Sequence, residues 1–183
     1  MDGQSNRFVQ PDGRVVEKQM EVMKQLFDLG ILFDRTNNLE HFKQSFANTA
    51  KKEIAYRGDQ TITTDDILND IINTSLMIGS QGKYFDQKKD FLNVGIGLKQ
   101  LKSFIYEGSF RIDDAILASA RAAYLAAITL TGYQGEILRW RDGDDIMNYN
   151  ITPIDYQFLN KQRNVPGGPL FYWYHTLKLI GKL

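Results

Sequence analysis

The stretch "DDAILASARAAYLAAITLTGY" (residues 113–133) decides the fold class of this chain. Two carboxylates, Asp113 and Asp114, open it, and negative charge is favoured at the positive end of a helix dipole. Gly132 follows its last apolar residues, where a left-handed residue commonly ends a helix. The stretch between them is rich in alanine. These signals predict a long helix over residues 113–131.

This helix carries a flat surface of small side chains at helical spacing, formed by Ala115, Ser119, Ala122 and Ala126. Small residues permit short distances between packed helices. One interpretation is the central helix of a tight bundle, which we favour. The other is a packing face against a second subunit of a ring. Both interpretations can be true, because one side of the helix can pack inside the bundle while the opposite side contacts another subunit.

The same stretch is about long enough to cross a bilayer, but it contains Arg121. Its many Ala, Ser and Thr residues make it too weakly apolar for a transmembrane segment. We therefore interpret it as a buried helix and expect no association with a membrane.

Glycines mark the ends of further helices along the chain. Segments with a three-to-four-residue apolar period end at Gly30, Gly58, Gly79 and Gly108. One such apolar stripe consists of Ile67, Ile71, Thr74 and Ile78. The expected helices cover residues 14–29, 38–57, 64–78, 86–107, 113–131, 153–163 and 169–180.

These elements predict a mainly α fold with three parts. Residues 1–132 form a bundle of about five helices. Residues 133–165 break the helical pattern and are expected to hold a short hairpin or extended loop, followed by a short helix. Residues 166–183 form a carboxy-terminal arm behind the sequence Pro-Gly-Gly-Pro, which we interpret as a flexible break.

The composition excludes several classes of function. The 183 residues are enough for one domain with a proper core. The absence of cysteine excludes disulfides, cysteine zinc sites and thiol catalysis. Lys plus Arg and Asp plus Glu both number 22, so the net charge gives no general attraction to nucleic acid.

Two glycine-containing motifs fall short of nucleotide-binding signatures. "GSQGKY" (79–84) has Tyr84 where a P-loop needs Ser or Thr, and no strand precedes it, so a helix cap and loop is favoured. Gly95 and Gly97 have the first spacing of a dinucleotide fingerprint, but its third glycine is absent. We expect them to allow close approach of a neighbouring helix or subunit, or to mark a kink.

Polar groups that could carry chemistry are few. Asp142, Asp144 and Asp145 have calcium-like spacing but lack the other ligands of an EF-hand, so a solvated turn is favoured. His41 and His175 are the two histidines, and neither shows the partners of a catalytic triad. The sequence therefore predicts no catalytic, cofactor or metal site.

The tail "NVPGGPLFYWYHTLKLIGKL" (164–183) departs most from a plain bundle. From Tyr156 onwards there is no acidic residue, whereas four basic residues occur. Aromatic side chains are enriched at the centres of interfaces. The predicted partner-binding residues are Pro169, Leu170, Phe171, Tyr172, Trp173, Tyr174, His175 and Leu177. The same apolar spacing would equally close the chain's own core, and both destinations stay open.

The size, the capped helical bundle, the absence of cysteine and the carboxy-terminal arm together resemble the head-to-tail connector (adaptor, or ring) proteins of tailed bacteriophages. The Asn, Ile, Lys and Tyr content is similar to that of proteins from AT-rich phages, such as the crAss-like phages. The resemblance implies a twelve-subunit ring beneath the portal, around the DNA channel, without chemistry. It implies a location in the neck of the virion, contacts with portal and tail proteins, proximity to DNA, and assembly in the host cytoplasm.

Three hypotheses follow from the sequence. The first is a structural connector subunit that forms a homo-oligomeric ring and buries its arm in another chain. The second is a monomeric nucleic-acid-binding protein that uses its basic, aromatic tail. The third is an enzyme built on His41, His175 or the turn from Asp142 to Asp145.

Overall fold

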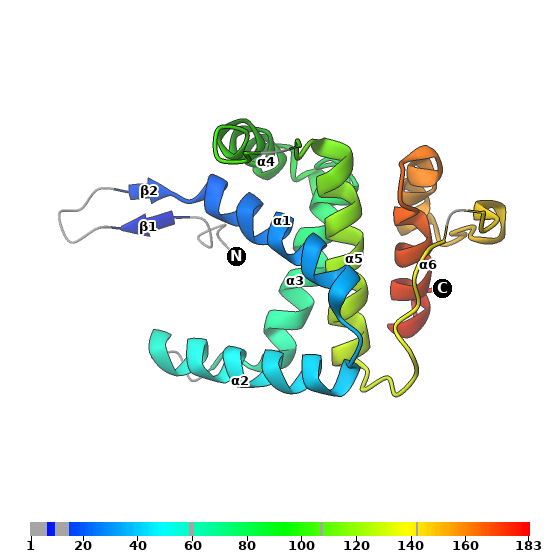
Figure 1. The fold of residues 1–183 in the computed structure, drawn as a ribbon, viewed down its shortest axis with the longest axis horizontal. Coiled ribbons are helices and arrows are strands. Elements are labelled where there is room, and N and C mark those ends of the chain that lie inside the picture. Colours follow the sequence, from blue (N-terminus) through cyan, green and yellow to red (C-terminus); the bar gives the residue numbers. More distant parts are fainter. Residues whose placement is uncertain (1–6, 10–14, 59–60, 107, 142) are drawn as a thin grey trace.

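A computed structural model of the chain describes residues 7–9, 15–58, 61–106, 108–141 and 143–183 (Figure 1). An antiparallel hairpin comes first, formed by β1 (Arg7–Val9) and β2 (Val15–Glu17). The α-helices are α1 (Gln19–Arg35), α2 (Leu39–Arg57), α3 (Thr64–Gly79), α4 (Lys88–Leu101), α5 (Ile112–Leu130) and α6 (Pro169–Leu179). The 3-10 segments are η1 (Tyr84–Asp86), η2 (Ile146–Asn148) and η3 (Ile154–Asn164).

The fold is mainly α, as predicted, but more helices pack into one bundle than the five or so that were expected. The described residues contain six α-helices and the eleven-residue η3, which makes seven helical elements longer than one turn rather than a bundle of about five. The difference arises because α6 and η3 pack onto the other helices instead of standing apart from them.

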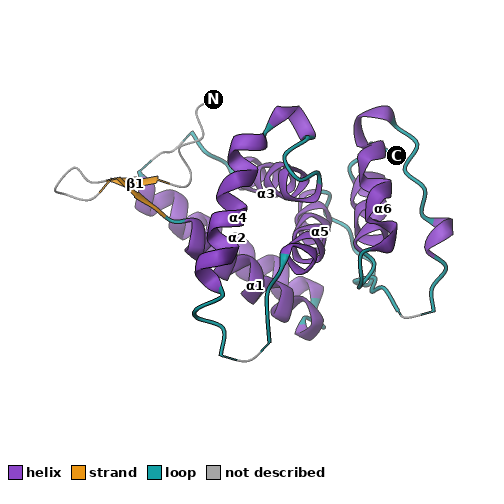
Figure 2. Cartoon of the chain, turned by 90° about the horizontal axis from the view of Figure 1, so that it is seen from above, coloured by secondary structure: helices purple, strands orange, loops and turns teal. Residues whose placement is uncertain are grey.

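Helix α5 lies at the centre of the fold, with α1, α3 and α6 packed around it (Figures 1 and 2). Twelve of its 19 residues are buried. Ala120, Ala123 and Ala127 have no exposed surface at all. Because alanine presents only a methyl group, three helices can approach the α5 backbone closely.

A second, smaller core joins α1 and α4 near the start of α5. Its buried members include Met23 of α1, Val94 and Leu101 of α4, and Ala115 of α5. This core fixes one face of α4 against α1, and the rest of the α4 circumference is left to other contacts or to solvent.

Gly97 is the point where α4 and α1 come closest. A Cβ atom at this position would lie 2.7 Å from Met23 Cγ and 2.8 Å from the carbonyl carbon of Gln19. Only glycine fits such an approach of two backbones. The predicted close approach is thus confirmed for Gly97, whereas a Cβ at Gly95 would meet nothing within 4 Å.

Helix starts follow from local hydrogen bonds. The backbone N–H of His41 donates to Asn38 Oδ1 at 2.9 Å, which caps α2. Thr63 and Asp66 form a capping box at α3, and the hydrogen bonds from Thr63 lower the pKa of Asp66. At α5, the N–H of Arg111 donates to Asp114 Oδ2 at 2.8 Å, so one of the two predicted acidic residues closes the first turn.

The first helix differs from its predicted range. It was expected over residues 14–29 but covers Gln19–Arg35, and β2 occupies Val15–Glu17. The helix passes through Gly30, where a Cβ would make only ordinary contact with Ala118 at 3.4 Å. Gly30 therefore does not end α1, because its backbone keeps helical geometry beside α5.

Of the two forms predicted for residues 133–151, the extended loop is the one found in the described part of that segment. Its backbone is held by buried side chains instead of by a second strand. The N–H of Leu138 donates to the Tyr124 hydroxyl at 3.1 Å, and the N–H of Trp140 donates to the Tyr172 hydroxyl at 3.2 Å. Burial raises the pKa of Tyr124 to about 12, so it stays a neutral acceptor for the loop.

We predict opposite effects for two alanine substitutions on α4. Gly97→Ala lowers the free energy of unfolding by about 1–3 kcal/mol, because the added methyl group forces α1 and α4 apart. Gly95→Ala raises it by about 0.5–1 kcal/mol, because it meets no neighbour and removes backbone freedom from the unfolded chain. Urea unfolding at low protein concentration measures both. Equal effects at the two positions would contradict this account of the α1–α4 contact.

Candidate functional site

The predicted arm is helix α6, and its large side chains lie in the chain's own core. Leu170 and Trp173 have no exposed surface, and Leu177 is 1% exposed. The Tyr172 ring packs edge-on against Phe33 of α1, with 5.3 Å between centroids. The prediction of an arm that docks outside the domain is therefore corrected: in this structure the segment takes the other predicted destination. The side chains fill the space that the alanines of α5 leave open.

The sequence Pro-Gly-Gly-Pro before α6 is a packed turn, not the flexible break that was predicted. Gly167 and Gly168 both adopt left-handed backbone geometry, with φ of 79° and 67°. A Cβ at Gly167 would meet the Leu117 side chain, and one at Gly168 would lie against the Trp140 ring. Glycine is required here both by conformation and by contact.

The predicted oligomer-packing residues are also in the core. Ala115 and Ser119 are fully buried, and Ala122 and Ala126 are 5% and 3% exposed. The Ser119 hydroxyl donates to the carbonyl of Ile116 at 2.8 Å, so it needs no partner from another chain. The prediction of a subunit-packing face on this surface does not hold, because helices of the same chain already cover it.

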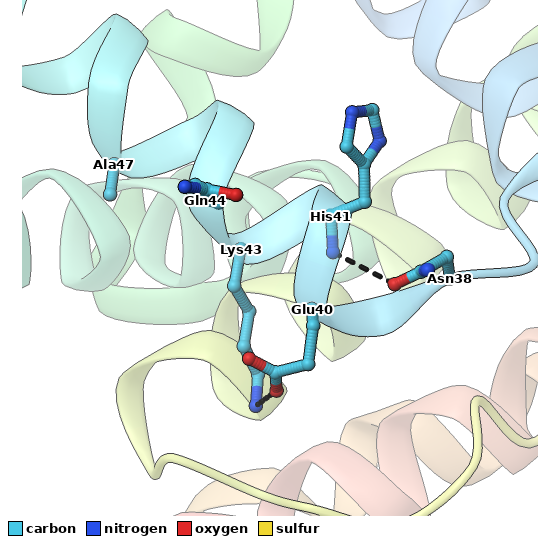
Figure 3. Close-up of a pocket in the computed structure, with 6 residues that line it drawn as sticks. All are labelled: Asn38, Glu40, His41, Lys43, Gln44 and Ala47. Atoms are coloured by element: carbon cyan, nitrogen blue, oxygen red, sulfur yellow. Dashed lines mark hydrogen bonds and ion pairs between the residues drawn. The ribbon is translucent and has the colours of Figure 1, made fainter.

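The two histidines lie in different environments. His41 is exposed on α2, in a shallow depression lined by Asn38, Glu40, His41, Lys43, Gln44 and Ala47 (Figure 3). Figure 3 shows its ring pointing away from Lys43 and Glu40, which form an ion pair of 3.3 Å. His175 instead contacts aromatic rings, the nearest being Phe171 at 4.5 Å between centroids. Neither arrangement supplies the nucleophile and orienting carboxylate of a triad.

The acidic turn is used for local structure. Asp142 lies outside the described residues. Asp144 Oδ2 accepts the N–H of Arg141 at 2.8 Å, and Asp145 Oδ1 accepts the N–H of Met147 at 2.9 Å. Among the described residues, no group of three or more His, Asp or Glu side chains is placed to hold a metal ion.

An open groove of about 400 Å³ lies between α3, α5 and α6. Its polar lining includes Asn69, Asn73, Tyr84 and Lys182, and Tyr156 also borders it. Burial, together with Tyr156 beside it, raises the pKa of Tyr84 to about 12. A phenol with that pKa is neutral at physiological pH and is a poor general base.

Large apolar side chains are exposed on the outer side of α4. Leu92 is 67% exposed and Ile96 is 46% exposed. With 3.6 residues per turn, they share an arc of about 100° with three lysines. We call this surface the α4 face, and it consists of Lys88, Lys89, Leu92, Ile96 and Lys99. It lies opposite Val94, Gly97 and Leu101, which are buried against the core.

A second exposed apolar surface lies on the segment 143–156. Met147 is 62% exposed and Ile154 is 83% exposed. The segment carries three carboxylates and no basic residue. We call this surface the acidic face, and it consists of Asp144, Asp145, Met147, Ile154 and Asp155. In both Figures 1 and 2, α5 and α6 lie between α4 and η2, which carries Met147. Ile154 and Asp155 begin η3.

Sequence reasoning missed both faces. It predicted a helix over residues 86–107 but did not consider Leu92 and Ile96 as a second apolar side of it. A helix with apolar residues on two opposite sides is a detectable signal, because a single core can bury only one of them. The acidic face gives a weaker signal, since a lone exposed Met or Ile is common on protein surfaces.

No helix in the described ranges combines the length and apolar character that crossing a membrane requires. Comparisons with known protein families, curated proteins and solved structures gave no match to this chain.

We predict that α6 behaves as core and not as a detachable arm. Trp173→Ala removes a fully buried ring and lowers the free energy of unfolding by about 3–5 kcal/mol. Lys178→Ala, on the exposed side of the same helix, changes it by less than about 0.5 kcal/mol. Chemical denaturation measures both. A Trp173→Ala protein as stable as the wild type would contradict the position of α6.

We predict that His175 makes folding stability depend on pH. Burial lowers the pKa of His175 in the folded protein, and nearby Lys178 adds to the effect. The unfolded chain therefore binds the proton first, so stability is lost as the pH falls below about 6.5 towards the lower folded pKa. His175→Gln removes this part of the pH dependence between about pH 7.5 and pH 5. His41→Gln, on the exposed face of α2, is the matched control and keeps it.

Proposed function

We propose that this chain is a structural connector subunit, which forms a homo-oligomeric ring between the portal and the tail in the neck of a tailed phage virion. The observation that carries this proposal is the presence of exposed apolar surfaces on both sides of a well-filled core. Leu92 and Ile96 are exposed on α4, and Met147 and Ile154 on the segment 143–156. Contiguous exposed apolar groups commonly mark contacts between proteins.

The placement of polar groups favours an assembly role over catalysis. His175 lies among aromatic rings, and the carboxylates of Asp144 and Asp145 accept backbone N–H groups of their own loop. Tyr84, one of the titratable groups of the groove, is held neutral by its raised pKa. These groups are dispersed over separate elements, whereas an active site brings a nucleophile, a base and an orienting group together.

The alternative, a monomeric nucleic-acid-binding protein that uses its tail, receives less support. Stacking on bases requires exposed aromatic rings. Phe171, Tyr172 and Trp173 are at most 5% exposed. The basic residues Lys178 and Lys182 remain on the surface, but without those rings they provide only non-specific charge.

We expect the purified chain to assemble. Sedimentation velocity at micromolar concentration should give a mass that is a multiple of 21.0 kDa, and electron microscopy should show closed rings. Mixing with the portal protein from the same genome should give a complex that co-sediments. A 21.0 kDa monomer that does not bind the portal would contradict the proposal.

A further inference from the structure

We infer that the α4 face of one subunit binds the acidic face of the next, so that the chain associates head to tail with a second copy of itself. The inference deepens the proposed function and rests on it. It names the two surfaces that would join neighbouring subunits, and each is built from residues that the core does not use.

The charges of the two surfaces are complementary. The α4 face has Lys88, Lys89 and Lys99 around its apolar centre, of which Lys88 is paired with Asp86 at 3.1 Å, and the helix contains one acidic residue, Asp90. The acidic face has carboxylates around Met147 and Ile154 and no basic residue between 143 and 156. Two copies of the same face would repel each other, whereas one of each attract. Complementary potentials of this kind select partner and orientation.

The apolar centres are complementary as well. Leu92 and Ile96 lie one helical turn apart, so their side chains form one ridge on α4. Met147 and Ile154 are carried by a single continuous segment, and methionine adapts its shape readily to a partner. An apolar centre with a charged rim is the usual anatomy of a protein interface.

The arrangement of the faces determines the symmetry of the contact. A two-fold dimer uses the same patch on both subunits, whereas contacts between two different patches continue from subunit to subunit. Helix α4 and the η2 part of the acidic face lie on different sides of the α5–α6 pair (Figures 1 and 2). Such a contact leaves one face free at each end of a dimer, and the assembly stops only when it closes into a ring.

The first test exchanges the charges. Lys89→Glu with Lys99→Glu gives one variant, and Asp144→Lys with Asp155→Lys gives the other. Each variant alone should fall to the 21.0 kDa monomer at a concentration where the wild type is assembled, with at least about tenfold weaker association. An equimolar mixture should regain the wild-type mass, because every interface then joins opposite charges. Lys51→Glu with Lys52→Glu, on the exposed side of α2, is the matched control and should assemble normally.

The second test separates a head-to-tail contact from a two-fold one. Leu92→Asp and Ile154→Asp should each give monomers alone. Their mixture should give a dimer and nothing larger, because only one intact pair of faces remains. An oligomer that tolerates Ile154→Asp but not Leu92→Asp would assign a two-fold contact through α4 and would overturn the inference.

Folding controls and the remaining outcomes keep the inference separate from the proposed function. Circular dichroism checks that each variant is folded, and Asp155→Lys alone replaces the double variant if loss of the Asp144 hydrogen bond unfolds the loop.

Wild-type rings that resist all these substitutions would overturn the inference and leave the connector function standing. Rings that follow the expected pattern but ignore the portal would support the inference and contradict that function. A wild-type monomer that binds duplex DNA through Lys89 and Lys99 would overturn both.

Discussion

The rest of the structure depends on the burial of α5 by three other helices. Its alanines let α1, α3 and α6 lie close to its backbone, and twelve of its residues are buried as a result. Two hydroxyls in this interior donate within their own helices. The Thr176 hydroxyl donates to the carbonyl of Tyr172 at 2.8 Å, as the Ser119 hydroxyl does to that of Ile116. These two hydroxyls are satisfied inside the core, whereas the buried Nε1 of Trp173 and Oε1 of Gln162 have no hydrogen-bond partner among the described residues.

The small side chains of α5 explain the large ones of α6. Close-packed interiors need a large side chain to face a small one, since a void between two small surfaces loses dispersion contacts. Tyr172 and Trp173 supply that volume, and the Tyr172 hydroxyl also accepts the N–H of Trp140 and fixes the neighbouring loop. The large side chains of α6 thus fill the space that the small side chains of α5 leave open, although some forty residues of sequence lie between the two helices.

Local signals in the sequence predicted the helices well, and long-range contacts were where prediction failed. The range 64–78 was expected and α3 covers Thr64–Gly79, because the capping box of Thr63 is encoded within four residues. The predicted apolar stripe on that helix coincides only in part with the buried side: Ile78 is buried and Ile71 packs against the core, but Thr74 is exposed. Leu68 and Ile72, one position along, are buried as well. Both stripes have helical period, and only the position of α5 decides between them. The destination of the tail was undecidable for the same reason.

The α4 face and the acidic face consist of residues that the core does not bury. A chain with 22 positive and 22 negative side chains has no net charge to keep its copies apart. In this molecule the local charges are nevertheless segregated, with lysines on α4 and carboxylates on 143–156. Each surface also carries exposed apolar side chains, and in the head-to-tail contact that we propose unlike faces attract each other whereas like faces repel. A rigid core matters for such a contact, because the angle between the two faces decides whether successive subunits close into a ring or continue as a filament. In the contact that we propose, that angle would depend on how α4 and the segment 143–156 are held relative to α5. Helix α4 packs mainly on α1, and α1 and α6 both pack on α5, so the alanine helix would position the two faces without belonging to either of them.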